Sequence, residues 1–133
     1  HAMTHRSTLS ILFLAVSLLG SPLTFAHHAF TAQYDAEART DLTGVLVKVE
    51  WLNPHAYFYL DVEDPETGKV TTWACELGSP VSMLRQGWTR ESLVLGEIFV
   101  VEGALARDGS PSMSASRVVI ESTGQRLFSR RQD

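Results

Sequence analysis

One short helix start interrupts a sequence that is otherwise patterned as β-strands. Ser79 can cap a helix whose first position is Pro80, and Gly87 can end it. This pattern predicts a helix over residues 80–86. Its inward face is expected to carry Val81, Met83 and Leu84.

Five strands are predicted around this helix, at residues 43–51, 56–62, 70–77, 98–104 and 114–121. The first two alternate apolar and polar residues with period two, which is typical of half-buried strands. A turn with Pro65 and Gly68 joins the second and third into a hairpin. The expected core residues are Val45, Val47, Val49, Phe58, Leu60, Val62, Ile98, Val100, Val118 and Ile120.

The order of these elements predicts an all-β fold with one short helix. Three strands, a helix and two strands within about 100 residues match an OB-like five-stranded Greek-key barrel. In that fold the helix between the third and fourth strands plugs the bottom of the barrel. An immunoglobulin-like sandwich would need about seven strands and no helix.

The first 26 residues have the layout of a secretory signal. An apolar run at residues 9–19 follows Arg6, and Thr24 and Ala26 supply small residues at the −3 and −1 positions. The run is short for a membrane span, and no stop-transfer pattern follows it. We therefore expect a periplasmic or secreted protein that starts at His27, with no stable membrane span after leader removal.

The same patterns predict how the chain is divided into segments. Residues 1–2 precede Met3 as a cloning remnant, and residues 3–26 are the leader. Residues 27–40 form an extended lead-in, anchored by Phe30 and Tyr34. The single barrel domain covers residues 41–128, and residues 129–133 form a tail.

The charge of the chain restricts the partners that can be expected, and its cysteine content restricts the disulfide bonds. Acidic residues outnumber basic ones, 15 to 11. Nucleic-acid affinity rests on Lys and Arg at phosphates, so no nucleic-acid partner is expected. Cys75 is the one cysteine, which excludes an internal disulfide and predicts a buried thiol in the core.

Three histidines of the expected mature chain point to a metal site. His27 would offer its α-amine and imidazole to one ion, with His28 beside it and His55 at a turn after Pro54. Amine and imidazole donors suit Cu(II) best among first-row ions. A chelate of this kind, completed by a second histidine, is the histidine brace of several exported copper proteins. Met83 and Met113 could add soft ligands, although the spacing of Met83 favours core packing.

Other interpretations stay open. The paired histidines can be functionally silent with no cofactor at all, and His55 can be a hydrogen-bonded turn residue. An aromatic and polar face can instead bind a small ligand or another periplasmic protein. Catalytic motifs such as G-x-S-x-G, a P-loop and H-E-x-x-H are missing, so an enzyme ranks third. The candidate ligand-binding residues are Trp51, Asn53, Tyr57, Tyr59, Trp73, Glu76 and Arg107.

The sequence also resembles a family of small exported bacterial proteins of unknown function, DUF6152. The resemblance covers nearly the whole mature chain, and its most specific parts are W-x-N-P-H and G-S-P…R-x-G-W. The resemblance implies export and a small single β-domain. It also implies that the paired histidines and His55 belong together. The resembling residues are His27-His28-Ala29-Phe30, Asp35, Gly44, residues 49–55, Trp73, residues 76–80 and 84–89, Gly96 and residues 107–109.

Overall fold

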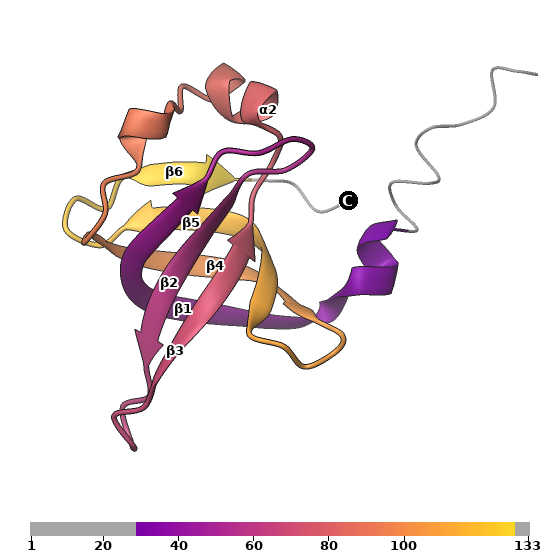
Figure 1. Cartoon of the computed structure of the whole chain (residues 1–133), viewed down its shortest axis with the longest axis vertical. Helices are drawn as coiled ribbons and strands as arrows, with labels where there is room; N and C mark the ends of the chain where they lie inside the picture. Colours follow the sequence, from indigo (N-terminus) through magenta and orange to yellow (C-terminus); the bar gives the residue numbers. More distant parts are fainter. Residues whose placement is uncertain (1–28, 130–133) are drawn as a thin grey trace, which may run out of the picture.

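The computed structural model describes residues 29–129, in which a short helix at residues 29–33 leads into six strands (Figure 1). None of the helices in this part of the chain has the length and apolarity needed to cross a bilayer. The strands are β1 (Tyr34–Glu50), β2 (Tyr57–Glu63), β3 (Val70–Glu76), β4 (Ile98–Ala106), β5 (Ser112–Ile120) and β6 (Arg126–Ser129). Helix α2 (Pro80–Arg85) and a 3-10 turn (Arg90–Ser92) lie between β3 and β4.

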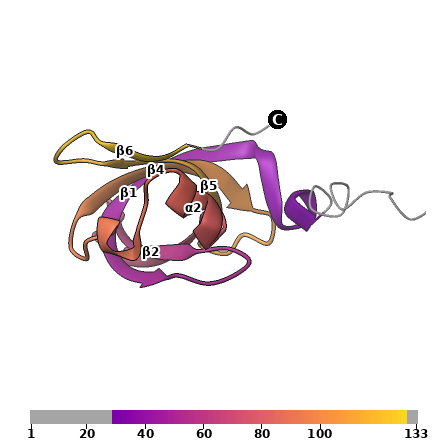
Figure 2. The ribbon, with the colours of Figure 1, turned by 90° about the horizontal axis from the view of Figure 1, so that it is seen from above.

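The strand pairings form a closed circuit. Strand β1 pairs antiparallel with both β2 and β4, β2 pairs with β3, and β4 pairs with β5. A short parallel pairing between β3 and β5 completes the ring. Helix α2 lies over one end of it (Figures 1 and 2). The prediction of an OB-like fold with a helix between the third and fourth strands is confirmed.

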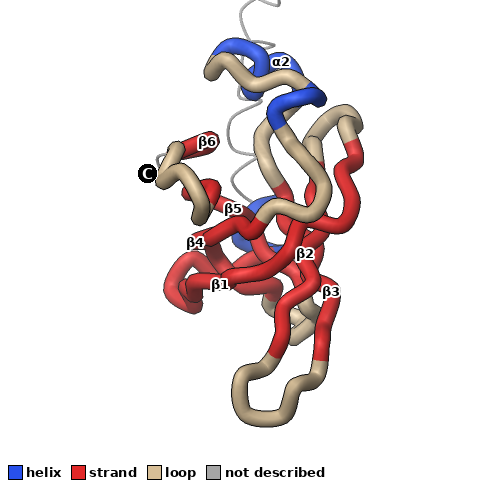
Figure 3. Tube along the Cα trace, turned by 90° about the vertical axis from the view of Figure 1, so that its left-hand side faces the viewer, coloured by secondary structure: helices blue, strands red, loops and turns tan. Residues whose placement is uncertain are grey.

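Two parts of the chain extend the predicted strands. The first strand already starts at Tyr34, so the second half of the expected lead-in belongs to β1. Strand β6 was not predicted, and it adds to the far side of β5. The hairpin turn between β2 and β3 forms as expected and projects from the body of the molecule (Figure 3). Gly68 closes this turn with φ +73°, where its amide donates to the carbonyl of Asp64 at 2.8 Å.

The helix caps follow the sequence, but the buried face does not. The Ser79 hydroxyl accepts a hydrogen bond from the Ser82 amide at 3.2 Å, and Gly87 follows the helix with φ +86°. The expectation for Val81 and Leu84 is wrong, because both are more than half exposed. A six-residue helix contacts the barrel along one narrow line, so only Pro80 and Met83, three residues apart, are buried.

Strand β1 contains a bulge that the alternating pattern conceals. Leu46 pairs with Leu60 and Lys48 pairs with Tyr59, which leaves Val47 without a partner between them. Val45 and Val47 are therefore exposed at 39% and 40%, and Leu46 is fully buried instead. Beyond the bulge the strand returns to the expected face, and Val49 packs against the core. The predicted burial of Val45 and Val47 is wrong.

The core is otherwise close to the expected one. In β2 and β5, Phe58, Leu60, Val118 and Ile120 are buried, and Val62 packs against them. In β4 the prediction is one residue out of register, because Phe99 and Val101 are buried while Ile98 is exposed and Val100 is only partly buried. The four residues at 98–101 are all apolar, so their pattern does not define a face. Packing decides it, with Phe99 placed edge-to-face against Phe58 at 5.8 Å.

Candidate functional site

A pocket of about 330 Å³ lies where residues 29–33 meet the barrel. It brings together the start of the described chain, the loop between β1 and β2, the first residue of β2 and the last residue of β3. The residues that line it are Ala29, Phe30, Gln33, Tyr34, His55, Tyr57 and Glu76.

Glu76 is the buried charge at the centre of this pocket. It ends β3 and is 6% exposed. Its Oε2 accepts hydrogen bonds from the hydroxyls of Tyr34 at 2.5 Å and Tyr57 at 2.9 Å. Its Oε1 lies 2.7 Å from Nδ1 of His55. These three partners offset the cost of removing a carboxylate from water.

His55 is held by this carboxylate at the mouth of the pocket. It follows Pro54, whose peptide bond with Asn53 is cis, and its side chain is 44% exposed. Because Nδ1 is directed at Glu76, the nitrogen left to meet an external ligand is Nε2. Metal-binding histidines commonly have this arrangement, in which a carboxylate fixes the ring orientation through the second nitrogen.

The two tyrosines at Glu76 stay protonated over a wide pH range. Burial, together with the hydrogen bond to Glu76, raises the pKa of Tyr57 to about 12. The same two causes raise the pKa of Tyr34 further still. Both phenols therefore remain hydrogen-bond donors to the carboxylate at neutral pH, and Glu76 keeps its position.

Arg107 fixes the short helix at residues 29–33 beside the pocket. Its Nε donates to the carbonyl of Thr31 at 2.6 Å, and its backbone amide donates to the carbonyl of Gln33 at 3.0 Å. Its Nη1 lies 3.7 Å from the carboxylate of Asp35. The sequence pointed to Arg107 as a ligand-binding residue, but these contacts make it a clamp on the chain that forms one wall of the pocket.

We expect Arg107→Ala to loosen this helix without unfolding the barrel. A hydrogen bond from a charged donor contributes about 1.5–3 kcal/mol, so amide exchange over residues 29–35 should rise by about ten-fold or more. The free energy of unfolding should change by less than about 1 kcal/mol, since Arg107 is exposed. The exposed Arg90 offers the matched control as Arg90→Ala. Unchanged exchange at residues 29–35 would show that Arg107 does not clamp them.

The structure unites some predicted site residues and separates others. His55, Tyr57 and Glu76 meet in the pocket, whereas Tyr59 donates to Glu50 at 3.0 Å, outside the pocket lining. Asn53 is exposed on the loop before His55, and Trp51 and Trp73 pack against the core. His27 and His28 lie outside the described residues. Within residues 29–129 there is no group of three or more His, Cys, Asp or Glu side chains that could hold a metal ion by themselves.

Four pocket residues were not predicted as ligand contacts: Ala29, Phe30, Gln33 and Tyr34. Phe30 and Tyr34 were expected only to anchor the lead-in, and Tyr34 does so with 1% exposure. Their rings lie 5.6 Å apart. The sulfur atoms of the chain's core are not accessible to a ligand, because Cys75, Met83 and Met113 are all fully buried. This confirms the core location expected for Cys75 and Met83.

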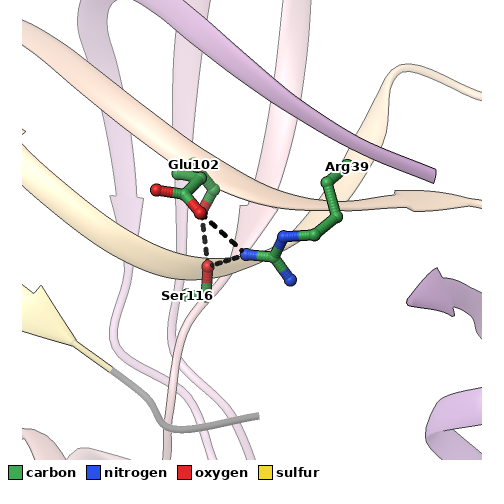
Figure 4. Close-up of polar contacts among 3 residues, drawn as sticks. All are labelled: Arg39, Glu102 and Ser116. Atoms are coloured by element: carbon green, nitrogen blue, oxygen red, sulfur yellow. Dashed lines mark hydrogen bonds and ion pairs between the residues drawn. The ribbon is translucent and has the colours of Figure 1, made fainter. Parts of the chain in front are cut away.

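A second hollow, of about 290 Å³, lies on the outer face of β1, β4 and β5. At its side Arg39 pairs with Glu102 at 3.1 Å and donates to the Ser116 hydroxyl at 2.6 Å (Figure 4). Exposed ion pairs of this kind contribute little to stability and are common on solvated sheet faces. We therefore assign the candidate site to the pocket at Glu76.

Comparison with known proteins places the chain in a family. The model described as "Family of unknown function (DUF6152)" matches residues 16–114. The chain belongs to this family. DUF6152 membership confirms the resemblance seen in the sequence. A comparison with curated proteins finds no match.

A solved structure similar to this DUF6152 protein is the mitochondrial single-stranded DNA binding protein Rim1 from S. cerevisiae. The two share 10% identity with a TM-score of 0.49, over 70% of this chain and 96% of Rim1. The expectation of no nucleic-acid partner was drawn from charge alone, and this finding does not support it. The acidic balance of the whole chain says nothing about the local surface of an OB-like fold, and we withdraw the exclusion.

Proposed function

We propose that this DUF6152 protein is an exported, non-catalytic metal-binding protein that holds a copper-type ion at the pocket beside His55. One observation carries the proposal. Nδ1 of His55 lies 2.7 Å from the buried Glu76 carboxylate, which directs Nε2 outward as a ligand nitrogen. Glu76 in this role orients the histidine and need not touch the metal.

The remaining donors would come from His27 and His28. Ala29 lines the pocket, and His28 is bonded to it. Two residues span at most about 7 Å, so the length of the chain allows both histidines to reach the pocket. If the leader is removed after Ala26, the α-amine and ring of His27 supply two nitrogens and His55 a third. Three nitrogen donors of this type suit Cu(II).

Titration of the chain starting at His27 with Cu(II) tests the proposal. We expect one equivalent to bind with visible d–d absorption, and His55→Ala to abolish the tight site. Glu76→Gln should weaken affinity by about 10–100-fold, as is usual when the carboxylate partner of a metal-binding histidine is changed.

A chain starting at Ser21 is the matched control for the amine. It keeps His27, His28 and His55 but moves the α-amine away from His27. We expect weaker Cu(II) binding in this longer form. Equal binding by the two forms would exclude the amine as a ligand, and binding that is unaffected by His55→Ala would overturn the site.

A second candidate is a small-ligand pocket with no metal. The ring pair of Phe30 and Tyr34, together with Tyr57, gives the same pocket an aromatic wall. A fragment screen by NMR on the metal-free protein would test it. Shifts confined to Tyr34 and Tyr57, with no Cu(II) binding at His55, would favour this function.

A further inference from the structure

The buried carboxylate of Glu76 takes up the hydrogen-bond donors of the pocket. A carboxylate can only accept hydrogen bonds, so the hydroxyls of Tyr34 and Tyr57 donate to it, as does Nδ1 of His55. When Nδ1 of a neutral imidazole carries the proton, Nε2 has a free lone pair and acts as an acceptor. His55 therefore presents an acceptor, and not a donor, to a molecule in the pocket.

The amide of Gln33 has the same polarity. Its Nε2 donates to the Tyr34 hydroxyl at 3.2 Å, so its carbonyl oxygen Oε1 is the atom that remains for another partner. A ligand that matches Oε1 of Gln33 and Nε2 of His55 must itself supply N–H or O–H donors. A carboxylate ion has acceptors only and does not fit this set.

Glu76 also determines the charge of the pocket. At a pH where His55 is neutral, Glu76 is the one charged side chain of the described lining, and its three partners are neutral donors that do not cancel its charge. Beside the pocket, Arg107 and Asp35 lie 3.7 Å apart and offset each other. A negative charge that is 6% exposed is weakly screened by solvent and salt, so it attracts a cation into the pocket.

Two aromatic rings are accessible beside this charge. Phe30 and Tyr57 line the pocket and are only partly buried, whereas Tyr34 is 1% exposed and lies behind them as support, with its ring 5.6 Å from that of Phe30. The faces of aromatic rings attract ammonium groups and also pack against apolar ones. The volume of about 330 Å³ is at the small end of the range for ligand pockets, about 300–1,000 Å³, so the ligand must be small.

We propose that the pocket binds a small organic ammonium ion, a primary amine carried on an apolar ring or a short apolar chain. The ammonium group donates to Nε2 of His55 and to Oε1 of Gln33, and the charge of Glu76 attracts it. The apolar part of the ligand lies against Phe30 and Tyr57. The inference needs no metal and rests on the second candidate function, the small-ligand pocket, whose ligand it names.

Three probes that share one ring test the inference: benzylammonium, benzyl alcohol and benzoate. Each is titrated into the metal-free chain starting at His27 at about pH 8, where an ordinary imidazole is neutral and an alkylammonium is charged. NMR shifts of the backbone amides at Tyr34 and Tyr57 locate the binding and measure its affinity. We expect benzylammonium to bind at least about ten-fold more tightly than benzyl alcohol, because a charged donor and a cation–π contact add to the ring contact. Benzoate should not bind measurably.

Variants separate the charge from the shape of the pocket. Glu76→Gln removes the charge with little change of shape, so the preference for benzylammonium over benzyl alcohol should fall to about two-fold, the share of the aromatic rings. Glu50→Gln is the matched control and should keep the full preference, because Glu50 also accepts from a tyrosine hydroxyl but lies outside the lining.

His55→Phe provides a second test that does not depend on the folding of Glu76→Gln. The side chain of His55 is 44% exposed on its loop, so this variant keeps a ring there and removes the acceptor Nε2. The affinity for benzylammonium should fall by about ten-fold, while that for benzyl alcohol should change less.

The outcomes separate this inference from the function on which it rests. Equal affinities for benzylammonium and benzyl alcohol, or a preference that is unchanged in Glu76→Gln, overturn the inference and leave the small-ligand pocket in place. Failure of all three probes to bind also overturns the inference, and the fragment screen then decides separately on the pocket. Loss of the preference in Glu76→Gln but not in Glu50→Gln supports the inference.

Discussion

Leu46→Ala should lower the free energy of unfolding by about 2–5 kcal/mol, whereas Val47→Ala should change it by less than about 0.5 kcal/mol. The two residues are neighbours in β1, and the bulge places one fully inside and leaves the other 40% exposed. Truncation of a buried leucine removes apolar contacts and leaves a cavity. Truncation of the exposed valine does neither.

Urea denaturation followed by tryptophan fluorescence would measure both values. The m-values should stay equal, so that a shift of the midpoint reports stability alone. Because the strict alternation of the sequence favours Val47 as the core residue, the pair decides between two registers. A larger loss for Val47→Ala than for Leu46→Ala would contradict the bulge.

Alkaline pH should destabilise the protein in two stages. Burial raises the pKa of the Cys75 thiol to about 12 from an ordinary value of 9.0. Tyr57 is raised to about 12 from 10.0, and Tyr34 is raised as well. Each group keeps its proton in the folded chain after the unfolded chain has lost it, so stability present at lower pH is lost as pH rises. The loss is at most about 1.4 kcal/mol per pH unit for each group, and it is smaller for Tyr57, which is partly exposed.

The stages have different slopes because the groups ionise at different pH in the unfolded chain. Cys75 contributes from about pH 9, and above about pH 10 the tyrosines with a raised pKa, Tyr34, Tyr57 and Tyr59, add to it and make the slope steeper. Urea denaturation at successive pH values would measure both slopes. Cys75→Ala should remove the first stage, and Tyr57→Phe should make the second stage less steep. A second stage unchanged in Tyr57→Phe would contradict the assignment of Tyr57.

Local signals in the sequence predicted the elements that depend on local chemistry. The Ser79 cap, the proline after it and Gly87 specify where α2 begins and ends. The turn at residues 64–68 specifies the hairpin in the same way. These features need only neighbouring residues, so a sequence carries them in full.

Register could not be predicted where it depends on partners distant in sequence. The bulge at Val47 arises in the pairing of β1 with β2, and β4 presents four apolar residues in a row. Strand β6 has weak alternation over four residues. In each case the decision is made by packing against other strands, as for Phe99 on Phe58.

The candidate site was predicted in part for the same reason. His55, Tyr57 and Glu76 were singled out by residue type, and Glu76 stood out as a charge in an apolar strand. Their contact with Tyr34 joins positions 42 residues apart. Only the closed order of the strands brings the start of β1 to the end of β3, so spacing along the chain gave no indication of it.

The short parallel pairing between β3 and β5 has a consequence for how such a protein can diversify. Glu76 pairs there with Ser114. The residue that orients His55 is therefore also one of the three β3 residues that pair with β5 and close the ring of strands. A change of the Glu76 side chain would therefore alter the contacts of His55 at a position where the ring of strands closes. His55 stands on an exposed loop outside the pairing and can be exchanged at small structural cost. Descendants of this chain could therefore acquire new ligands by loop substitutions while the carboxylate beneath them stays constant.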